Sequence, residues 1–407
     1  MLTRTRKLPA FISLCAIVAL STNMALALSS VAEFQKLLRE RLTFDETDLA
    51  ALQHGQTVVK LLPVQDKREV AVSGLVRLQV PAEVFLQSFR ESMVRKSNPA
   101  ILEIGSFSSQ PTLDDLNGLT VENRDIDDLK KCVVGDCRLK LSATMIERFQ
   151  KEVDWEAPDY SNQATQLFRV MLLDYVRGYR ARGDQALMEY RDQAKAVRLA
   201  EEQGELKANS SYVYDMISRS SRSVKGLPKS ELAEVENAIV WSKMKFGLKP
   251  VIAINHIKIF KSDTDSGPQI LIASKQIYAN HYFDSSLALT AFVNVPGGSS
   301  GSYLFYENRS RADGLDGVFG GIKRGIVEGK AVDGLKAILE QSKTNLTARS
   351  LSQSDSATVV ETGRSWKRWT VGRVHVFTWL FGILAFVSLL ALINYNWRNV
   401  VARTAHD

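Results

Sequence analysis

Apolar and polar positions change their period several times along this chain of 407 residues, and each period predicts a different kind of element. Residues 70–80, VAVSGLVRLQV, are rich in β-branched side chains and predict a strand. Pro81 then opens a predicted helix that runs to about Arg95, and residues 101–107 predict a second strand. One face of the predicted helix is formed by Val84, Phe85, Ser88 and Phe89.

The middle of the chain has helical spacing. Thr144 and Glu147 have the spacing of a capping box, and apolar residues then recur at helical intervals over 164–176, up to a stop at Gly183. Asp184 is a suitable N-cap for a further helix. The apolar positions of that helix are Leu187, Tyr190, Ala194 and Val197.

The pattern then returns to strands. The strand-like runs are residues 238–246, 251–260, 270–282, 287–295 and 302–309. They are separated by turn-forming clusters, among them DTDSGP at 263–268 and PGGSSG at 296–301. Consecutive strands with such short connections predict an antiparallel meander.

A long helix, predicted over residues 313–343, follows the meander and covers one of its faces. Asp313 is a suitable N-cap for it. Its unusual feature is a stripe of glycines four residues apart, namely Gly317, Gly321, Gly325 and Gly329. Because a glycine inside a helix costs roughly 1 kcal/mol relative to alanine, the stripe needs a reason. Two reasons remain open, which are close approach of the helix to the sheet and room for a ligand between them.

The predicted elements follow the order of the helix-grip fold: a strand, a helix, a strand, an antiparallel run of strands and one long helix. In this order, and in the segment VSGLVRLQVPAEVFLQSF (72–89), the chain resembles the START-like (SRPBCC) superfamily, which includes lipid-transfer domains, polyketide cyclases and aromatic-ring-binding proteins. The resemblance covers about residues 70–108 and 237–343. It implies an α+β fold whose sheet grips the long helix and leaves an apolar cavity between them.

The part of the chain that is expected to be exported falls into three regions. Residues 28–141 are expected to form its N-terminal α+β part, 142–236 a large helical insertion, and 237–344 the sheet and long helix. SKQIYANHYFD (274–284) and YENRSRADGLDGVFGGIKRG (306–325) further resemble segments of uncharacterised exported, membrane-anchored bacterial proteins. No activity comes with that likeness.

A run without any formally charged residue, 374–393, stands near the C-terminus. Twenty helical residues span about 30 Å, the thickness of the hydrocarbon core of a bilayer. Tryptophan and tyrosine flank the run on both sides, as at membrane interfaces. We therefore expect one transmembrane helix over 374–397; the alternative is a buried core helix. The Ser/Thr-rich segment before it predicts a flexible tether with a basic flank over 345–373.

The N-terminus has the composition of a signal peptide. Three basic residues precede an apolar stretch at 11–20, and Ala25-Leu26-Ala27 is a small-x-small cleavage site, so residues 1–27 are expected to be removed. An uncleaved N-terminal anchor is the alternative. Together with the C-terminal run, this predicts a single-pass protein of the inner (plasma) membrane whose main domain is periplasmic.

Charge and cysteine usage agree with export. The formal net charge is +7, but the excess basic residues lie at the two ends and leave the body near neutral, which argues against a nucleic-acid partner. Once the signal peptide is removed, Cys132 and Cys137 are the remaining cysteines, in CVVGDC. We expect a disulfide between them rather than a metal site, because two cysteines leave a tetrahedral ion half-ligated.

His256 and His281 lie within the strand region. If the hairpin turns at 263–268, His256 pairs near Lys275, and the two imidazoles are about 20 Å apart at about 3.3 Å per residue, too far to share an ion. We therefore predict no metal site.

Two other clusters have a functional and a structural interpretation. His281 is followed by Asp284 and two serines, which fits either an oriented general base or a histidine with one structural hydrogen bond. Arg309 and Arg311, beside Asn308 and Asp313, fit either an anionic headgroup or ion pairs with nearby carboxylates. PGGSSG lacks the Lys-Ser/Thr ending of a phosphate-binding loop, so no cofactor is expected.

The sequence thus favours a tethered binder of an apolar or amphiphilic, lipid-like ligand, held between the sheet and the glycine-striped helix. The candidate ligand-binding residues are Tyr278, His281, Tyr282, Arg309, Arg311, Gly317, Gly321 and Gly325. The alternative is a non-enzymatic envelope scaffold that uses the helical block as the surface for an envelope protein partner. A hydrolytic enzyme is third, and no catalytic residue is assigned.

Overall fold

The structure of the chain is a computed structural model. It describes residues 35–36, 38–94, 100–213, 233–264, 267–294, 301–315 and 320–361. The expected signal peptide and the expected crossing at 374–397 lie outside these residues. Within the described ranges, no helix combines the length and the apolar character that a membrane crossing requires.

One antiparallel sheet forms the centre of the fold, with strand order β1-β2-β10-β9-β8-β7-β6-β3. Its strands are β1 (Val58–Leu61), β2 (Glu69–Leu78), β3 (Ile101–Phe107), β6 (Ala233–Met244), β7 (Val251–Thr264), β8 (Gly267–Ala279), β9 (Phe283–Asn294) and β10 (Ser302–Ala312). The predicted meander is β6 to β10, and each of its strands pairs with the next. The predicted register of His256 opposite Lys275 is confirmed.

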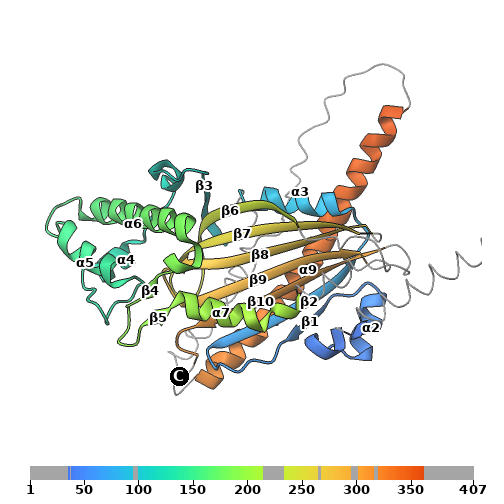
Figure 1. Cartoon of the computed structure of the whole chain (residues 1–407), viewed down its shortest axis with the longest axis horizontal. Helices are drawn as coiled ribbons and strands as arrows, with labels where there is room; N and C mark the ends of the chain where they lie inside the picture. The colour runs from blue at the N-terminus through green and yellow to red at the C-terminus, as the bar shows by residue number, and fades with distance from the viewer. Residues whose placement is uncertain are drawn as a thin grey trace, which may run out of the picture.

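Helices cover both faces of the sheet. They are α2 (Glu46–Gln53), α3 (Ala82–Ser92), α4 (Asn123–Leu129), α5 (Ala143–Glu152), α6 (Tyr160–Arg182), α7 (Leu199–Asn209) and α9 (Gly320–Glu361). Figure 1 shows α9 crossing behind the sheet, with α6 and α7 in front of it. The fold is therefore α+β, with an antiparallel sheet against a long C-terminal helix and a helical insertion between β3 and β6.

The insertion differs from the sequence prediction in two places. Helix α5 is capped by Ser142, whose hydroxyl oxygen accepts the backbone N–H of Met145, and the expected capping box of Thr144 and Glu147 does not form. Residues 187–198 form a short hairpin, β4 (Glu189–Tyr190) and β5 (Val197–Arg198), where a helix capped by Asp184 was expected. Asp184 instead lies in the 3₁₀ turn Gly183–Ala186. Tyr190, an apolar position of the expected helix, is buried, and its hydroxyl accepts the backbone N–H of Ala279. Burial against the sheet thus overrides the weak helical period.

The boundaries of the long helix also differ. It begins at Gly320 rather than at Asp313, and Gly314 adopts a left-handed backbone (φ 74°) in the connection. The side chain of Asp313 is therefore available to bind Lys140 rather than to cap a helix. At its other end, α9 continues through residues 345–361, for which the composition predicted a flexible tether.

The approach of α9 to the sheet depends on a glycine in the sheet rather than on the glycine stripe. A Cβ at Gly74 of β2 would lie 2.5 Å from Leu339 Cδ1 and 3.1 Å from Leu335 Cδ2, so a larger residue there would force these side chains of α9 to shift. A Cβ at Gly321, Gly325 or Gly329 would have no atom within 4 Å. Close approach to the sheet therefore does not explain the stripe at these three positions, and Gly317 lies outside the described residues.

Candidate functional site

The face of the sheet toward α9, here called the helix-side face, is mostly apolar. It includes Ile257, Ile272 and Leu304, which form one core with Leu335 and Leu339 of α9. Uncharged polar side chains interrupt this core on four neighbouring strands, β7 to β10. We call them the polar band: Asn255, Ser274, Gln276, Ser286, Asn308 and Ser310.

The strand register brings the polar band together. Ser310 pairs with Ser286, and Gln276 with Asn255. Gln203 of α7 links the two pairs, because its side-chain amide donates to the carbonyl oxygens of Gln276 (2.8 Å) and Ser286 (3.0 Å). These four residues therefore form one row across the sheet.

The next row of the helix-side face holds Asn308, Ala288 and Ser274, which are paired in turn. The next residues in this row are apolar, namely Val72, which pairs with Asn308, and Ile257, which pairs with Ser274. The polar band is thus two rows deep and has apolar residues at both ends.

The hydrogen bonds of the polar band are incomplete. Ser310 Oγ lies 2.7 Å from Ser286 Oγ and 2.8 Å from Asn308 Oδ1. The side-chain nitrogen of Gln276 has no hydrogen-bond partner, although the residue is only 3% exposed. Leaving a buried amide donor unpaired costs about 1–3 kcal/mol. Such a group points to a ligand or a bound water that completes it.

Around the polar band, aromatic and helical elements complete the helix-side face. The ring of Phe246 contacts those of Tyr282 and Phe283, and Phe246 and Tyr282 pack against this core, to which Phe283 belongs. Tyr282 has a left-handed backbone (φ 60°), and its hydroxyl accepts the backbone N–H groups of Leu248 and Lys249. Among the described helices, α3 packs on β8 while α9 packs on β1, β2 and α3. The backbone of α9 thus approaches the sheet most closely at β1 and β2.

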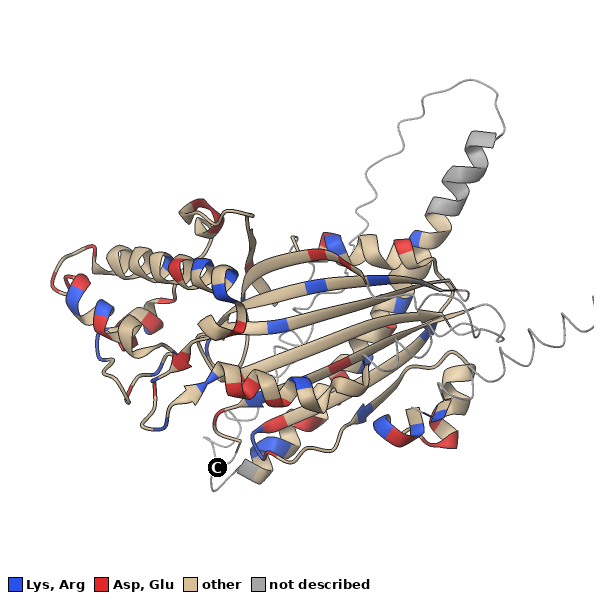
Figure 2. Ribbon diagram, in the orientation of Figure 1, with Lys and Arg blue, Asp and Glu red and all other residues tan. Residues whose placement is uncertain are grey.

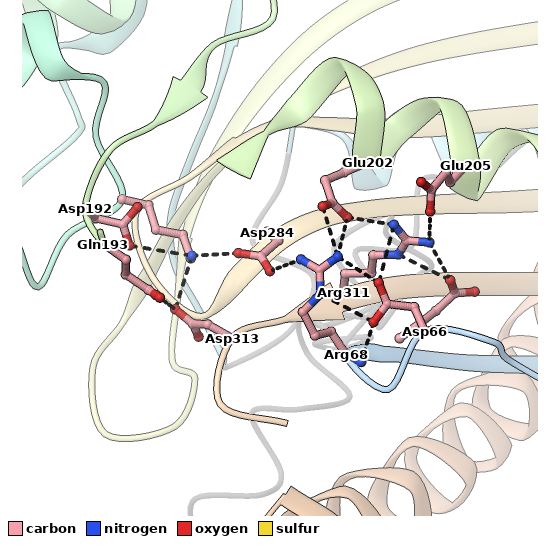
Figure 3. A network of polar contacts seen from close by, with 11 residues as sticks. Asp66, Arg68, Asp192, Gln193, Glu202, Glu205, Asp284, Arg311 and Asp313 are labelled. Carbon is pink, nitrogen blue, oxygen red and sulfur yellow. Dashed lines mark hydrogen bonds and ion pairs between the residues drawn. The ribbon is translucent and has the colours of Figure 1, made fainter. Parts of the chain in front are cut away.

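The opposite face of the sheet contains a buried network of ion pairs, whose first part is centred on Lys140. Its ammonium group is 2.8 Å from Asp284 Oδ1, 3.1 Å from Asp313 Oδ2 and 3.8 Å from Asp192 Oδ2. Figure 3 shows these three aspartates around one nitrogen. Burial opposes the charge of Lys140, but the three carboxylates hold its pKa above the ordinary value. Burial also raises the pKa of Asp192 and of Asp313.

The network continues through two arginines toward α7. Arg68 bridges Asp284 (3.0 Å) to Glu202 (3.0 Å). Arg311 binds Glu202 and Glu205 of α7, and also Glu69 of β2. Figure 2 shows acidic and basic residues gathered along α7, while the strands of the sheet carry few charges. The network therefore connects the helical insertion to β2, β9 and β10.

Arg309 and Glu307 form the last part of the network. Arg309 pairs with Glu69 and Glu307, both fully buried. Glu307 also accepts hydrogen bonds from Ser210 and Tyr212, and burial raises its pKa. Arg309 and Arg311 thus have the structural role of bridging carboxylates, and their partners lie on β2, the loop before it, β10 and α7 rather than on the connection near Asp313.

His281 belongs to a separate buried cluster. Its Nε2 is 2.9 Å from Asp125 Oδ2, and Lys249 also binds Asp125 (2.7 Å). Burial alone would raise the pKa of Asp125, but the hydrogen bonds from His281 and Lys249 outweigh it and lower that pKa. Asp284 is occupied by Lys140 and Arg68, so His281 is not oriented by Asp284. This geometry fits the structural interpretation of His281 rather than a general base.

His256, the other histidine of the strand region, is hydrogen-bonded by its two ring nitrogens to Tyr179 (2.7 Å) and Asn237 (2.8 Å). Burial, together with Lys275 and Lys258, lowers its pKa to about 4. Across the described part of the chain, no group of three or more His, Cys, Asp or Glu side chains is arranged to hold a metal ion. The predicted disulfide between Cys132 and Cys137 is present.

The structure does not bring the predicted ligand-binding residues together. Arg309 and Arg311 lie in the ion network, and Tyr278 is fully buried beneath the helical insertion, where it contacts Phe168 and Tyr190. Gly321 and Gly325 are exposed on α9. Tyr282 alone of the predicted residues in the described ranges packs against the core of the helix-side face.

The polar band was missed because its residues are not unusual one by one. The available signal was alternation: in NRSR (308–311) and SKQ (274–276), uncharged polar residues alternate with charged ones. A strand with such a pattern presents an uncharged polar face and a charged face.

Comparison of the chain with protein families, with curated proteins and with solved structures found no match.

Proposed function

We propose that this protein is a membrane-anchored, extracytoplasmic binder of an amphiphilic, lipid-like ligand that lies on the helix-side face of the sheet, beside α9. The polar end of the ligand contacts the polar band, and its apolar part lies along the neighbouring core residues. The expected signal peptide and the expected C-terminal crossing support a position of this domain beside a bilayer, which is a source of such ligands.

The observation that carries the proposal is the buried, unpartnered side-chain nitrogen of Gln276 in the polar band of a mostly apolar face. Ligand sites are typically apolar surfaces with a few convergent polar groups. The neighbouring side chains of Ser274, Ser286 and Ala288 are small, which favours a ligand group beside Gln276.

The test is to purify the full-length chain in detergent and to identify bound molecules by native mass spectrometry and organic extraction. Wild-type protein should retain an amphiphile in a stoichiometric amount. Two variants of strand β9 separate a ligand site from a packed core. Ala288 lies on the helix-side face, whereas Ala291 lies in the core of the opposite face.

Ala288→Phe should remove the bound amphiphile with little loss of thermal stability, because the ring occupies the volume of the ligand. Ala291→Phe, the matched control, should lower the free energy of unfolding by about 1–3 kcal/mol, the usual cost of overpacking a closed core. Equal destabilisation by both changes, with no amphiphile in the wild type, would show that the helix-side face is closed and would reject the proposal.

A second function, an envelope interaction protein, is favoured by one observation. The disulfide-closed loop exposes two adjacent valines, Val133 (57% exposed) and Val134 (40%). Contiguous exposed apolar residues mark protein contact surfaces, and these two valines are the candidate centre of one. Changing both to serine should then abolish binding of a co-purifying envelope protein while leaving any bound amphiphile in place.

A further inference from the structure

We infer that the polar end of the ligand is uncharged, of the hydroxyl or amide class, rather than a phosphate or carboxylate. This inference rests on the proposed function, and it concerns the chemistry that the polar band can recognise. The side chains of the band are amides and hydroxyls. Each of these groups can donate and accept hydrogen bonds, so together they match a neutral partner that does the same.

The cationic residues that adjoin the polar band on its own strands point to the other face. Lys261, farther along β7, lies on the helix-side face and is bound by Glu83 of α3. Arg309 and Arg311 alternate with Asn308 and Ser310 along β10, and the register with β9 stays regular as far as Arg311. Both guanidinium groups are buried and held by carboxylates, Glu69 being shared between them. These arginines therefore do not face the polar band, and their charge is already balanced.

Strands β7 and β8 repeat this arrangement. Lys275 lies between Ser274 and Gln276 and pairs with Asp184 on the side of the helical insertion. Lys258 lies next to Ile257 and pairs with Glu234. On α9, Arg324 is bound by Glu328 and by the carbonyl oxygen of Lys67. Lys258, Lys275 and Arg324 thus each have a carboxylate partner outside the polar band.

An anionic headgroup at the polar band would therefore be buried without a counter-charge. The effective cost of burying an unpaired ion is several kcal/mol even after relaxation. A hydroxyl or amide headgroup needs only hydrogen bonds, and the free nitrogen of Gln276 supplies a donor for one. Burial thus favours ligands such as diacylglycerols over the corresponding phosphatidates.

The experiment is a competition between two probes that differ only in a phosphate. Full-length protein in detergent micelles is equilibrated with equal amounts of dioleoylglycerol and dioleoylphosphatidate, and native mass spectrometry measures the occupancy of each. We expect dioleoylglycerol to be favoured at least tenfold. Equal occupancy, or preference for the phosphatidate, would overturn the uncharged headgroup but leave the amphiphile site standing. Binding of neither probe would overturn both this inference and the proposed function.

A pair of variants tests the assignment to the polar band. Gln276→Leu removes the free donor and should lower dioleoylglycerol occupancy about tenfold. Gln87→Leu, the control, makes the same change on the exposed surface of α3 and should leave occupancy unchanged. An unchanged preference and affinity in Gln276→Leu, with fold verified by its thermal unfolding curve, would place the headgroup elsewhere and contradict the assignment.

Discussion

Lys140 shows most clearly how single residues hold this molecule together. It is 2% exposed and lies within 4 Å of three aspartates from three different segments of the chain. Removing one member of a buried ion pair leaves the other charge without compensation, which typically costs about 3–5 kcal/mol. The charge of Lys140 is therefore a condition for packing the helical insertion on the sheet.

Lys140→Met should accordingly lower the free energy of unfolding by about 3–5 kcal/mol at pH 7. Lys130→Met is the matched control, because Lys130 pairs with a glutamate that is 90% exposed, and such surface pairs contribute less than about 1 kcal/mol. Urea denaturation of both variants measures the difference. Similar losses in the two proteins would mean that the cluster around Lys140 is solvated.

Asp192 gives a prediction with a defined pH dependence. Burial raises its pKa in the folded protein, so the protonated form favours folding. The stabilisation is present below the unfolded-state pKa of about 3.9 and is lost as the pH rises through the folded value. Asp192→Asn should therefore stabilise the protein at pH 7 and lose that advantage at pH 3. Urea titrations at the two pH values test this, and an advantage that grows on acidification would contradict it.

At the scale of elements, two glycines that look alike in sequence have opposite roles. Gly74→Ala places a methyl group 2.5 Å from Leu339 Cδ1 and should lower the free energy of unfolding by about 1–3 kcal/mol. Gly325→Ala meets no neighbouring atom and should raise it by up to about 1 kcal/mol through helix propensity. Thermal unfolding compares the two variants. Destabilisation by Gly325→Ala would show that the stripe contacts another surface.

Strong local patterns made several elements predictable. The strand β2 and the helix after Pro81 were located from a β-branched run and a proline, and Gly183 ends α6 with a left-handed backbone (φ 58°), as its position predicted. The hairpin at 187–198 was missed because its two-residue strands depend on burial of Tyr190 against the sheet. Tertiary contact, rather than local period, determines structure there.

At the scale of the whole molecule, the large antiparallel sheet has two different faces. The face toward α7 joins its elements with buried charges, as in the contacts of Arg311 with Glu69 and Glu202. The helix-side face has apolar residues and uncharged amides and hydroxyls. The sequence predicted the sheet, the long helix and the disulfide, but not this division. It depends on cross-strand register, which places Gln276 beside Asn255 and cannot be read from either segment alone.

The central claim is that the helix-side face holds an amphiphile, and photocrosslinking in cells tests it most directly. Cells expressing the full-length chain are grown with a photoactivatable fatty acid, irradiated, and the modified peptides of the protein are identified by mass spectrometry. We predict adducts on residues 267–279 and 302–312, which disappear in Ala288→Phe. Adducts confined to residues 374–393 in both proteins would contradict the account.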